Sequence, residues 1–260
     1  MSRHIPQTLA LMSAMPQELS CILKRLDAKP LQLGSRTYWQ AQWMGQSVVA
    51  VLSRIGKVAA ATTTASLIEH FGATQVVFSG VAGSLDQGVQ VGDVVIATEL
   101  LQHDMDASPL FPRYEIPLTN KSCFLTDLNL SLELKLAASQ CLQEVRANMQ
   151  LHGLWDQLGV QAKDICLHEG LILSGDQFIS SAKKSSELKL SQPSALAVEM
   201  ECAAVAQVCD DFGVPFAAVR IISDNANDTA HMDFEKFIQT VAAPYGAHVI
   251  ETFVKNRSIT

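Results

Sequence analysis

The sequence predicts an α/β fold built on a covered, mainly parallel sheet. Short apolar segments alternate along the chain with longer segments of helical periodicity, which is the order of elements in layered α/β folds. Most of the short segments are apolar on both faces, as strands covered by helices on both sides are. Hydrophobic residues make up 48% of the 260 residues and charged residues 17%, which suits one large domain or two small ones.

Seven segments are expected to form strands because each is a short apolar run rich in β-forming residues. They are residues 8–13, 47–53, 75–80, 93–98, 170–175, 195–200 and 215–222. The helices expected between them cover residues 17–27, 57–71, 127–149, 201–212 and 234–254. The helix over 57–71 should end at Gly72, since glycine readily adopts the left-handed conformation that closes helices.

Charge and composition exclude several classes of protein. The formal net charge is −7 and the chain has no cluster of Lys and Arg, so a nucleic-acid binder is not expected. The apolar runs are too short to span a bilayer, and the start of the chain lacks the pattern of a signal peptide. The six cysteines are scattered without a CxxC pair. We therefore expect a cytoplasmic protein with free thiols and no membrane or nucleic-acid partner.

Ligand sites in such sheets form at the carboxyl ends of the strands, so the residues that follow each strand are candidates. Glu18 follows the first strand near a helix start, where a carboxylate either is stabilised by the helix dipole or faces a site. Gly80, Gly83 and Gly88 either bring backbone N–H groups close to a ligand or form a tight turn. They match neither GxGxxG nor the GK[ST] ending, so neither a dinucleotide fold nor a P-loop is predicted.

Glu199 and Glu201 flank Met200 inside the apolar stretch ALAVEMECAAVAQVC, where burying an unpaired carboxylate is costly. If the strand continues, both glutamates point to the same side of the sheet. If it ends near Glu199, Glu201 stands at a helix start, where it either accepts hydrogen bonds from a vicinal diol or has a purely structural role. Phe178, which follows the strand over 170–175, either stacks on a flat ligand or packs into the core.

Ser223, Asp224 and Asn225 form a polar cluster directly after the strand over 215–222. They either cap the next helix or belong to a site. Candidates at five strand ends, from distant parts of the chain, favour the second interpretation.

Six segments occur in the order seen in the nucleoside phosphorylase superfamily: AMPQEL, SRIGKVAAA, SGVAGSL followed by VGDVV, SGDQF, AVEMECAAVA and RIISDNA. From about residue 7 to residue 254 the chain resembles the bacterial 5′-methylthioadenosine/S-adenosylhomocysteine nucleosidases of that superfamily. The resemblance implies a single domain over residues 1–260, with three α/β/α layers around a mixed, partly closed sheet. It also implies a homodimer that acts on a small nucleoside and needs no cofactor.

The resemblance implies roles for the candidate residues. Asp224, supported by Ser223, would protonate N7 of adenine, and Glu18 would activate the attacking water. Glu201 would bind the ribose 2′- and 3′-hydroxyls, while Glu199 would either face the site or tie down backbone. The remaining implied contacts are Met200 under the sugar, Val81 beside it where many relatives carry Ser, Phe178 stacked on the purine, the backbone of Ile179 at the adenine edge, Ile55 and Phe234 around the 5′-substituent, and Leu110 in the partner's pocket.

These residue types suit the chemistry of a purine nucleosidase. Cleavage of the purine–ribose bond passes through an oxocarbenium-like sugar, as glycoside hydrolysis does. The leaving adenine must be protonated while water on the opposite face is deprotonated. One protonated and one ionised carboxyl group can do both, and Asp224 and Glu18 fit these tasks. No metal is required, and no His, Cys and Asp residues have the sequence spacing of metal ligands.

Two alternatives stay open. A purine nucleoside phosphorylase would use phosphate in place of water, but Ser79 stands where related hexameric phosphorylases carry Arg, and Glu18 would repel phosphate. A non-catalytic nucleoside-binding or storage protein could share the fold, although it would not need all three carboxylates. The chain departs from its relatives at residues 107–124 and 143–165, near the expected dimer surface and 5′-pocket, so the sequence does not rank 5′-substituents.

Overall fold

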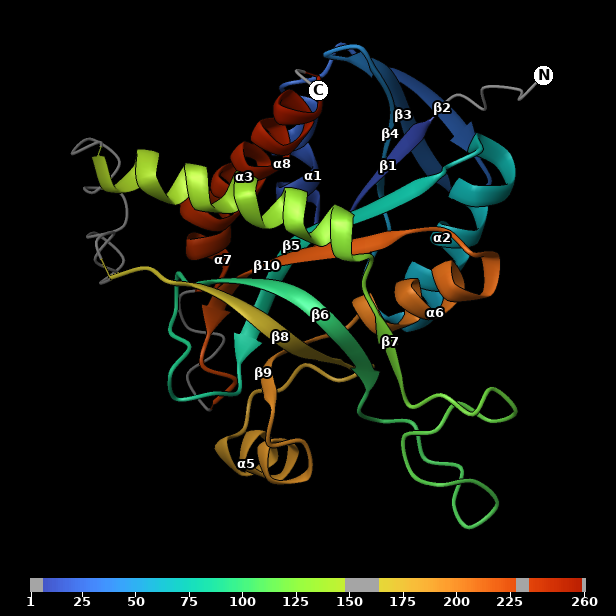
Figure 1. Ribbon diagram of the computed structural model, residues 1–260, viewed down its shortest axis with the longest axis vertical. Coiled ribbons are helices and arrows are strands. Elements are labelled where there is room, and N and C mark those ends of the chain that lie inside the picture. The colour runs from blue at the N-terminus through green and yellow to red at the C-terminus, as the bar shows by residue number, and fades with distance from the viewer. Residues whose placement is uncertain (1–6, 148–163, 228–233, 259–260) are drawn as a thin grey trace.

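The computed structural model describes residues 7–147, 164–227 and 234–258 (Figure 1). Its strands are β1 (Thr8–Ser13), β2 (Lys29–Leu33), β3 (Arg36–Trp43), β4 (Gln46–Leu52), β5 (Gln75–Ser84), β6 (Val94–Gln102), β7 (Cys123–Leu125), β8 (Leu167–Ser174), β9 (Ala195–Glu199) and β10 (Phe216–Asp224). Its helices are α1 (Pro16–Leu23), α2 (Lys57–Phe71), α3 (Leu128–Ala147), α5 (Ala182–Ser191), α6 (Cys202–Phe212), α7 (Phe234–Phe237), the π-helical turn η1 (Ile238–Ala242) and α8 (Ala243–Arg257). Every expected strand and helix has a counterpart, although the last expected helix is divided into α7, η1 and α8.

One sheet contains all these strands and closes on itself over half its width. The strand order is β10-β6-β8-β9-β5-β1-β4-β3-β2, and β10 also pairs with β5. The five strands β10, β6, β8, β9 and β5 therefore form a closed ring, and β1, β4, β3 and β2 extend from it as an open sheet. This is the partly closed α/β sheet that the sequence resemblance implies.

The expectation of a mainly parallel sheet holds for the seven predicted strands, although the sheet as a whole is mixed. Strands β1, β4, β5 and β10 form a parallel set, and so do β6, β8 and β9. The two sets join in antiparallel fashion at β10–β6 and β5–β9, and the hairpins of β2, β3 and β4 are antiparallel as well. Apolar segments indicate that a strand is covered on both faces, but they do not record its direction.

Helices cover the sheet on both faces, which gives the three expected layers (Figure 1). One face packs against α1, α3 and α8, and the other packs against α2 and α6. Successive residues of β10 enter opposite cores: Val219 joins the first cluster, whereas Ala218 and Ile222 join the second. This alternation follows from the two-residue period of a strand.

The sequence did not predict β2, β3, β7 or α5, and two of these, β2 and α5, bury little apolar surface. β2 (KPLQL) is an edge strand in which four of five residues are exposed. In α5, Leu188 is the one buried residue. Neither segment therefore carries the apolar periodicity that identifies strands and helices in a sequence.

Two further findings concern the cysteines and the lengths of the helices. All six cysteines are free thiols, as expected. Among the helices of the described residues, none combines the length and apolar composition needed to cross a bilayer.

Candidate active site

Three glutamates surround the buried guanidinium of Arg220, on the face of the sheet that α2 and α6 cover. Arg220 Nη2 donates to Glu199 Oε2 and lies 3.6 Å from Glu201 Oε2. Glu18 is close enough to interact electrostatically with the same guanidinium. The ring of Phe78 lies beneath it, 4.4 Å from Cζ to the ring centroid. One cation is thus shared by three carboxyl groups inside the molecule.

Glu18 is held by backbone N–H groups from two elements. Its Oε2 accepts hydrogen bonds from Ala14 N at 3.1 Å and Met15 N at 3.0 Å, which closes the capping box of α1. Its Oε1 accepts one from Val81 N in β5 at 3.1 Å. A carboxylate oxygen can accept two hydrogen bonds, so Oε1 keeps one acceptor position for another donor.

Glu199 and Glu201 have different environments, because β9 ends at Glu199 and the chain turns before α6. Glu199 accepts hydrogen bonds from the backbone N–H groups of Glu201 and Cys202, both at 3.0 Å, and from the Ser174 hydroxyl. It therefore ties down the start of α6. Glu201 is the N-cap residue of α6, and its Oε1 accepts from Gly56 N at 2.9 Å, which joins the start of α2 to the cluster.

Asp224 ends β10, four residues beyond Arg220. Its Oδ2 accepts a hydrogen bond from the Ser223 hydroxyl at 2.8 Å, and its Oδ1 accepts from Ala226 N at 2.8 Å. Ser223 Oγ also lies 3.3 Å from the carbonyl oxygen of Ala82. The Asp224 side chain is buried and is fixed against β5.

Two glycines of β5 make room for these side chains. The parallel register sets Gly80 opposite Arg220 and Gly83 opposite Asp224. A Cβ at Gly80 would overlap Arg220 Nη1, and a Cβ at Gly83 would lie 2.8 Å from Asp224 Oδ1. The segment after residue 80 is thus not the loop that the sequence suggested. β5 continues to Ser84, and its glycines admit side chains from the neighbouring strand.

Burial shifts the proton affinities of these acids. Burial raises the pKa of Glu18, although Arg220 and the three backbone N–H groups oppose the shift. Burial and the charge of Glu199 raise the pKa of Glu201 to about 8, against the opposing effect of Arg220. Burial also raises the pKa of Asp224, with Ser223 and the Ala226 N–H opposing it. The three carboxyl groups therefore keep their protons to a higher pH than exposed carboxyl groups do.

Sequence reasoning missed Arg220. It lies inside the strand FAAVRII, whereas ligand-binding residues are expected after the ends of strands in such sheets. A single charged residue within a run that is buried on both faces is itself a signal, because arginine is almost never fully buried without a partner. Here the side chain is about 1% exposed.

The other predicted contact residues differ in their degree of burial. Met200 and Val81 are half-buried, in the turn before α6 and in β5 beside the Glu18 carboxylate. Phe178 follows β8 and is 49% exposed, while the next residue, Ile179, is buried in a small apolar cluster. The flat ring of Phe178 is thus accessible at the surface near the end of β8.

Ile55, Leu110 and Phe234 are the residues predicted to surround the 5′-substituent. Ile55 lines a cavity of about 400 Å³ together with Arg36, Gly56, Val58, Ala59, Thr62 and Asp176. This cavity adjoins the cluster through Gly56, which bonds Glu201. Leu110 lies in a turn and is 84% exposed, without a contact to the cluster within the described chain. The side chain of Phe234 lies outside the described part of the structure.

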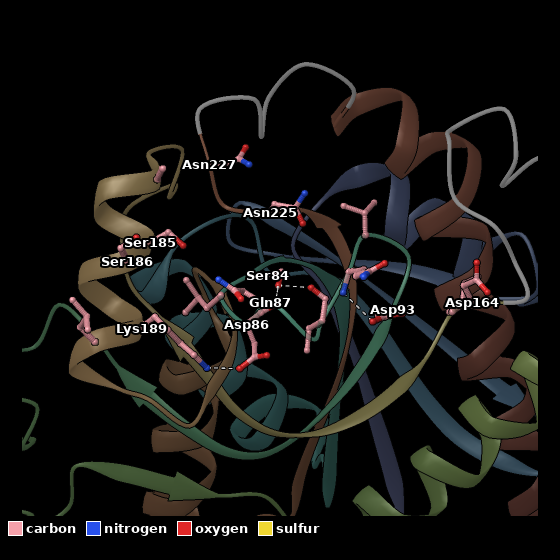
Figure 2. Close-up of a pocket in the computed structure, with 17 residues that line it drawn as sticks. Ser84, Asp86, Gln87, Asp93, Asp164, Ser185, Ser186, Lys189, Asn225 and Asn227 are labelled. Atoms are coloured by element: carbon pink, nitrogen blue, oxygen red, sulfur yellow. Dashed lines mark hydrogen bonds and ion pairs between the residues drawn. The ribbon is translucent and has the colours of Figure 1, made fainter.

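A cavity of about 1250 Å³ is not lined by Glu18, Glu199, Glu201 or Asp224 (Figure 2). It lies between the segment after β5 and α5, and it adjoins the cluster at Ser84 and Asn225, which follow Gly83 and Asp224. We assign the candidate active site to the carboxyl cluster and not to this cavity, since acid–base chemistry requires positioned proton donors and acceptors.

Similarity to known families agrees with this arrangement. The family model described as "Phosphorylase superfamily" matches residues 8–255. An aminodeoxyfutalosine nucleosidase of Helicobacter pylori (strain J99) is 35% identical over 252 residues, which cover 96% of this chain and 97% of the relative. A 5′-methylthioadenosine/S-adenosylhomocysteine nucleosidase of Haemophilus influenzae (strain PittEE) is 35% identical over 246 residues, or 94% and 97% of the two chains.

Solved structures extend the similarity to the fold. The 5′-methylthioadenosine/S-adenosylhomocysteine nucleosidase of Neisseria meningitidis, in complex with methylthio-immucillin-A, has a TM-score of 0.83 and 32% identity, with 96% of this chain and 99% of that chain covered. The futalosine hydrolase of Helicobacter pylori strain 26695 also has a TM-score of 0.83, with 33% identity and coverage of 97% and 99%. The protein therefore belongs to the phosphorylase superfamily and, within it, to the nucleosidases that hydrolyse N-glycosidic bonds.

Proposed function

We propose that the protein cleaves the N-glycosidic bond of 5′-methylthioadenosine, S-adenosylhomocysteine and related 5′-substituted adenosines, releasing adenine and the free ribose derivative. One observation carries the proposal. Two buried carboxyl groups with raised pKa, those of Glu18 and Asp224, lie against the same short stretch of β5, from Val81 to Gly83. Hydrogen bonds hold each of the two carboxyl groups at this stretch of β5.

Asp224 is the proposed general acid. Its raised pKa keeps a proton on the carboxyl group at a pH where an exposed aspartate would be ionised. Transfer of that proton to N7 turns adenine from a poor leaving group into a good one, so the C–N electron pair can depart with the base. Ser223 and the Ala226 N–H, which bond the two oxygens, fix the direction in which the proton points.

Glu18 is the proposed general base, and Arg220 positions it. The free acceptor position on Glu18 Oε1 can take a hydrogen bond from a water molecule beside Gly80 and Val81. A base with a raised pKa takes up the proton of the attacking water more readily than an exposed carboxylate does. Arg220 opposes the effect of burial on the pKa of Glu18 and so keeps Glu18 available in its ionised form.

The remaining contacts hold the nucleoside between these two groups. Glu201 would accept hydrogen bonds from the ribose 2′- and 3′-hydroxyls, with Met200 and Val81 beside the sugar. Phe178 would stack on the purine, and the Ile179 backbone would bond the adenine edge. The positions of these residues support their proposed roles, since they come from the turn before α6, from β5 and from the segment after β8.

The charge of the cluster favours water over phosphate as the nucleophile. Arg220 is a cation that the sequence analysis did not consider, and alone it would favour phosphate. However, three carboxyl groups share that single guanidinium, so it is not available as an unpaired cation for an incoming phosphate. Ser79 adds no positive charge at the position where the hexameric phosphorylases carry Arg.

The cavity beside Gly56 is the proposed site of the 5′-substituent. Ile55, Val58 and Ala59 give it an apolar wall, whereas Arg36 and Asp176 stand at its polar side. Such a lining accepts a thioether and leaves charged groups for a longer tail. The 5′-methylthioadenosine/S-adenosylhomocysteine nucleosidases and the aminodeoxyfutalosine nucleosidase are about equally similar to this chain. Their similarity therefore does not distinguish among these 5′-substituents.

A homodimer is part of the proposal. Ile55 and Val58, which line the cavity beside the cluster, are 57% and 77% exposed, and Leu110 is 84% exposed. A second copy would cover these side chains, and Leu110 in the segment around Asp106–Leu110 would close the 5′-pocket of its partner.

The decisive experiment measures adenine release from 5′-methylthioadenosine, S-adenosylhomocysteine, 5′-deoxyadenosine and aminodeoxyfutalosine, with and without phosphate. We expect release that is independent of phosphate and yields the free ribose derivative. Strict dependence on phosphate, with ribose 1-phosphate as product, would identify a phosphorylase instead. Tight binding without release would identify a binding protein. The kcat/KM values across the panel rank the 5′-substituents.

A further inference from the structure

Asp93, Cys166 and His168 converge at the start of two neighbouring strands, away from the carboxyl cluster. One potential ligand atom from each lies within 4.8 Å of the others. Asp93 directly precedes β6, and the parallel register pairs Val94 with Leu167 and Val95 with His168. Cys166 and His168 are two residues apart, so their side chains point to the same side of the sheet. Neighbouring strand starts thus bring together residues that are distant in the sequence.

The backbone orients the carboxylate of Asp93. Its Oδ1 accepts a hydrogen bond from Cys166 N at 2.7 Å, and its Oδ2 accepts one from Gln90 N at 2.9 Å. Such outer hydrogen bonds fix metal-binding carboxylates in many proteins. Because each oxygen can accept two hydrogen bonds, the carboxylate still has capacity for a further partner. His168 Nε2 occupies part of it, at 2.9 Å from Oδ2.

The thiol of Cys166 is accessible and weakly bound. The residue is exposed, and its Sγ lies 3.4 Å from the carbonyl oxygen of Asp164. Asp93 and Asp164 both line the large cavity in Figure 2, so an ion could reach the three side chains from solvent. His168 is about one quarter exposed, and Asp93 is nearly buried. An open thiol and imidazole thus stand beside a fixed carboxylate.

We propose that Asp93, Cys166 and His168 form a binding site for one Zn²⁺ ion or a similar divalent transition metal. A thiolate, an imidazole and a carboxylate are the three ligand types that zinc takes in proteins. Mg²⁺ and Ca²⁺ are disfavoured, since they prefer oxygen ligands throughout. Three protein ligands leave the fourth tetrahedral position to water. The site is independent of the proposed nucleosidase reaction.

The His168–Asp93 pair requires little movement to bind zinc. Zinc bonds of about 2.0–2.1 Å to nitrogen and 2.0–2.2 Å to oxygen, at the tetrahedral angle, separate the two ligand atoms by roughly 3.3 Å. His168 Nε2 and Asp93 Oδ2 are 2.9 Å apart, so they need to separate by only a few tenths of an ångström. The Zn–S bond forms as the Cys166 S–H bond breaks, and the thiol proton passes to the solvent. The imidazole proton moves from Nε2 to Nδ1, which frees the Nε2 lone pair.

The simpler interpretation is that His168 only ties β8 to Asp93 by a hydrogen bond. The two interpretations differ in the role of Cys166, because a tie between strands does not use its thiol.

Isothermal titration of the metal-stripped full chain with ZnCl₂ tests the proposal. We expect one Zn²⁺ per chain, with affinity at least about 10-fold lower in both Cys166→Ser and His168→Gln. Both variants keep the Cys166 backbone N–H that bonds Asp93, and Gln at 168 can still donate to the carboxylate. The controls are Cys123→Ser and His70→Gln, which remove another exposed thiol and another exposed imidazole and should bind as the original chain does.

Co²⁺ provides an independent readout, because thiolate ligation gives a charge-transfer absorption band in the near ultraviolet. The band should be present in the original chain and in Cys123→Ser, and absent from Cys166→Ser. The proposal is overturned if the original chain binds no stoichiometric Zn²⁺. It is equally overturned if either Cys166→Ser or His168→Gln binds the metal with unchanged affinity.

Discussion

At the scale of single residues, Arg220 sets the character of the site. Its guanidinium is shared by Glu18, Glu199 and Glu201, so none of these carboxyl groups has a cation to itself. A buried charge without its partner is strongly unfavourable. The shared arginine thus stabilises the cluster as a whole and leaves individual members free to exchange protons.

Asp224→Asn should lower kcat by at least about 10²-fold while the protein stays folded, because the amide keeps the size of the side chain but has no acidic proton to transfer. The alkaline limb of the pH–rate profile, which reports loss of the Asp224 proton, should disappear as well. Steady-state release of adenine across pH measures both effects. Asp211→Asn, an exposed aspartate of α6, is the matched control. Turnover close to that of the control would end the assignment of Asp224.

The raised pKa of Glu201 predicts how stability depends on pH. A carboxyl group with a pKa of about 8 when folded, against 4.5 as its ordinary value, binds more protons in the folded state than in the unfolded state between those pH values. Its contribution to the free energy of unfolding is complete below pH 4.5 and is lost as the pH rises to about 8. Glu18 and Asp224 contribute with the same sign, since burial raises their pKa values too.

Glu201→Gln should therefore flatten the fall of the melting temperature between about pH 4.5 and pH 8. Thermal unfolding at a series of pH values measures this, with the exposed Glu69→Gln as control. A variant that follows the original profile throughout would contradict the proposed protonation of Glu201.

The sequence predicted the acidic residues of the site but not the basic one. Glu18, Glu201 and Asp224 stand where strands end, and a polar residue there is visible against the apolar run before it. Arg220 is enclosed by apolar residues on both sides and was attributed to the strand. Asp93 and His168 were missed for another reason: 75 positions separate them, and only the pairing of β6 with β8 brings them together.

At the scale of elements, the pairing of β5 with β10 creates the site. The expected strand over 75–80 is too short, because glycines after residue 80 indicate a turn when the neighbouring strand is unknown. In the structure Gly80 and Gly83 lie opposite Arg220 and Asp224. Glycine in a strand marks a close approach of other atoms, but the sequence does not identify those atoms.

Gly80→Ala should destabilise the protein and reduce activity together. The added methyl group would overlap the Arg220 guanidinium and also lie 3.2 Å from Glu18 Oε1, so the ion cluster must rearrange. Disrupting a buried ion pair costs about 3 kcal/mol or more, which corresponds to a melting temperature lower by roughly 6–12 °C in a chain of this size. Calorimetry and adenine release measure the two effects.

Gly88→Ala is the matched control for this change, because a Cβ there would meet only the end of the flexible Asp86 side chain. Equal stability of the Gly80→Ala and Gly88→Ala proteins would show that the guanidinium can move aside without cost.

At the scale of the whole molecule, the sequence predicted the layers but not the closure of the sheet. Alternating apolar and helical segments are sufficient to infer an α/β fold. Ring closure depends on β10 pairing with β5 on one side and β6 on the other, which no local pattern encodes. The resemblance to known nucleosidases supplied that feature of the prediction.

The exposed apolar side chains at the start of α2 lead to a prediction about assembly. Val58→Glu should convert a dimer into a monomer and lower activity, since a charge at the centre of an apolar interface opposes association. Sedimentation velocity and adenine release on the same sample measure this. Leu132→Glu places the same charge on α3, which covers the opposite face of the sheet, and should change neither result. A monomeric and fully active original chain would remove the dimer from the proposal.

The closed ring of strands also determines when activity can first arise as the chain folds. Glu18 is placed by the first strand and helix, whereas Arg220 and Asp224 arrive with the last strand. Both segments pair with β5, so the catalytic groups come together only after β10 has paired with it. Contacts between such distant segments form slowly, because the entropy of loop closure is lost before the contacts are gained. A partly synthesised chain that lacks β10 has no assembled site, so adenine release during refolding would report the last step of folding.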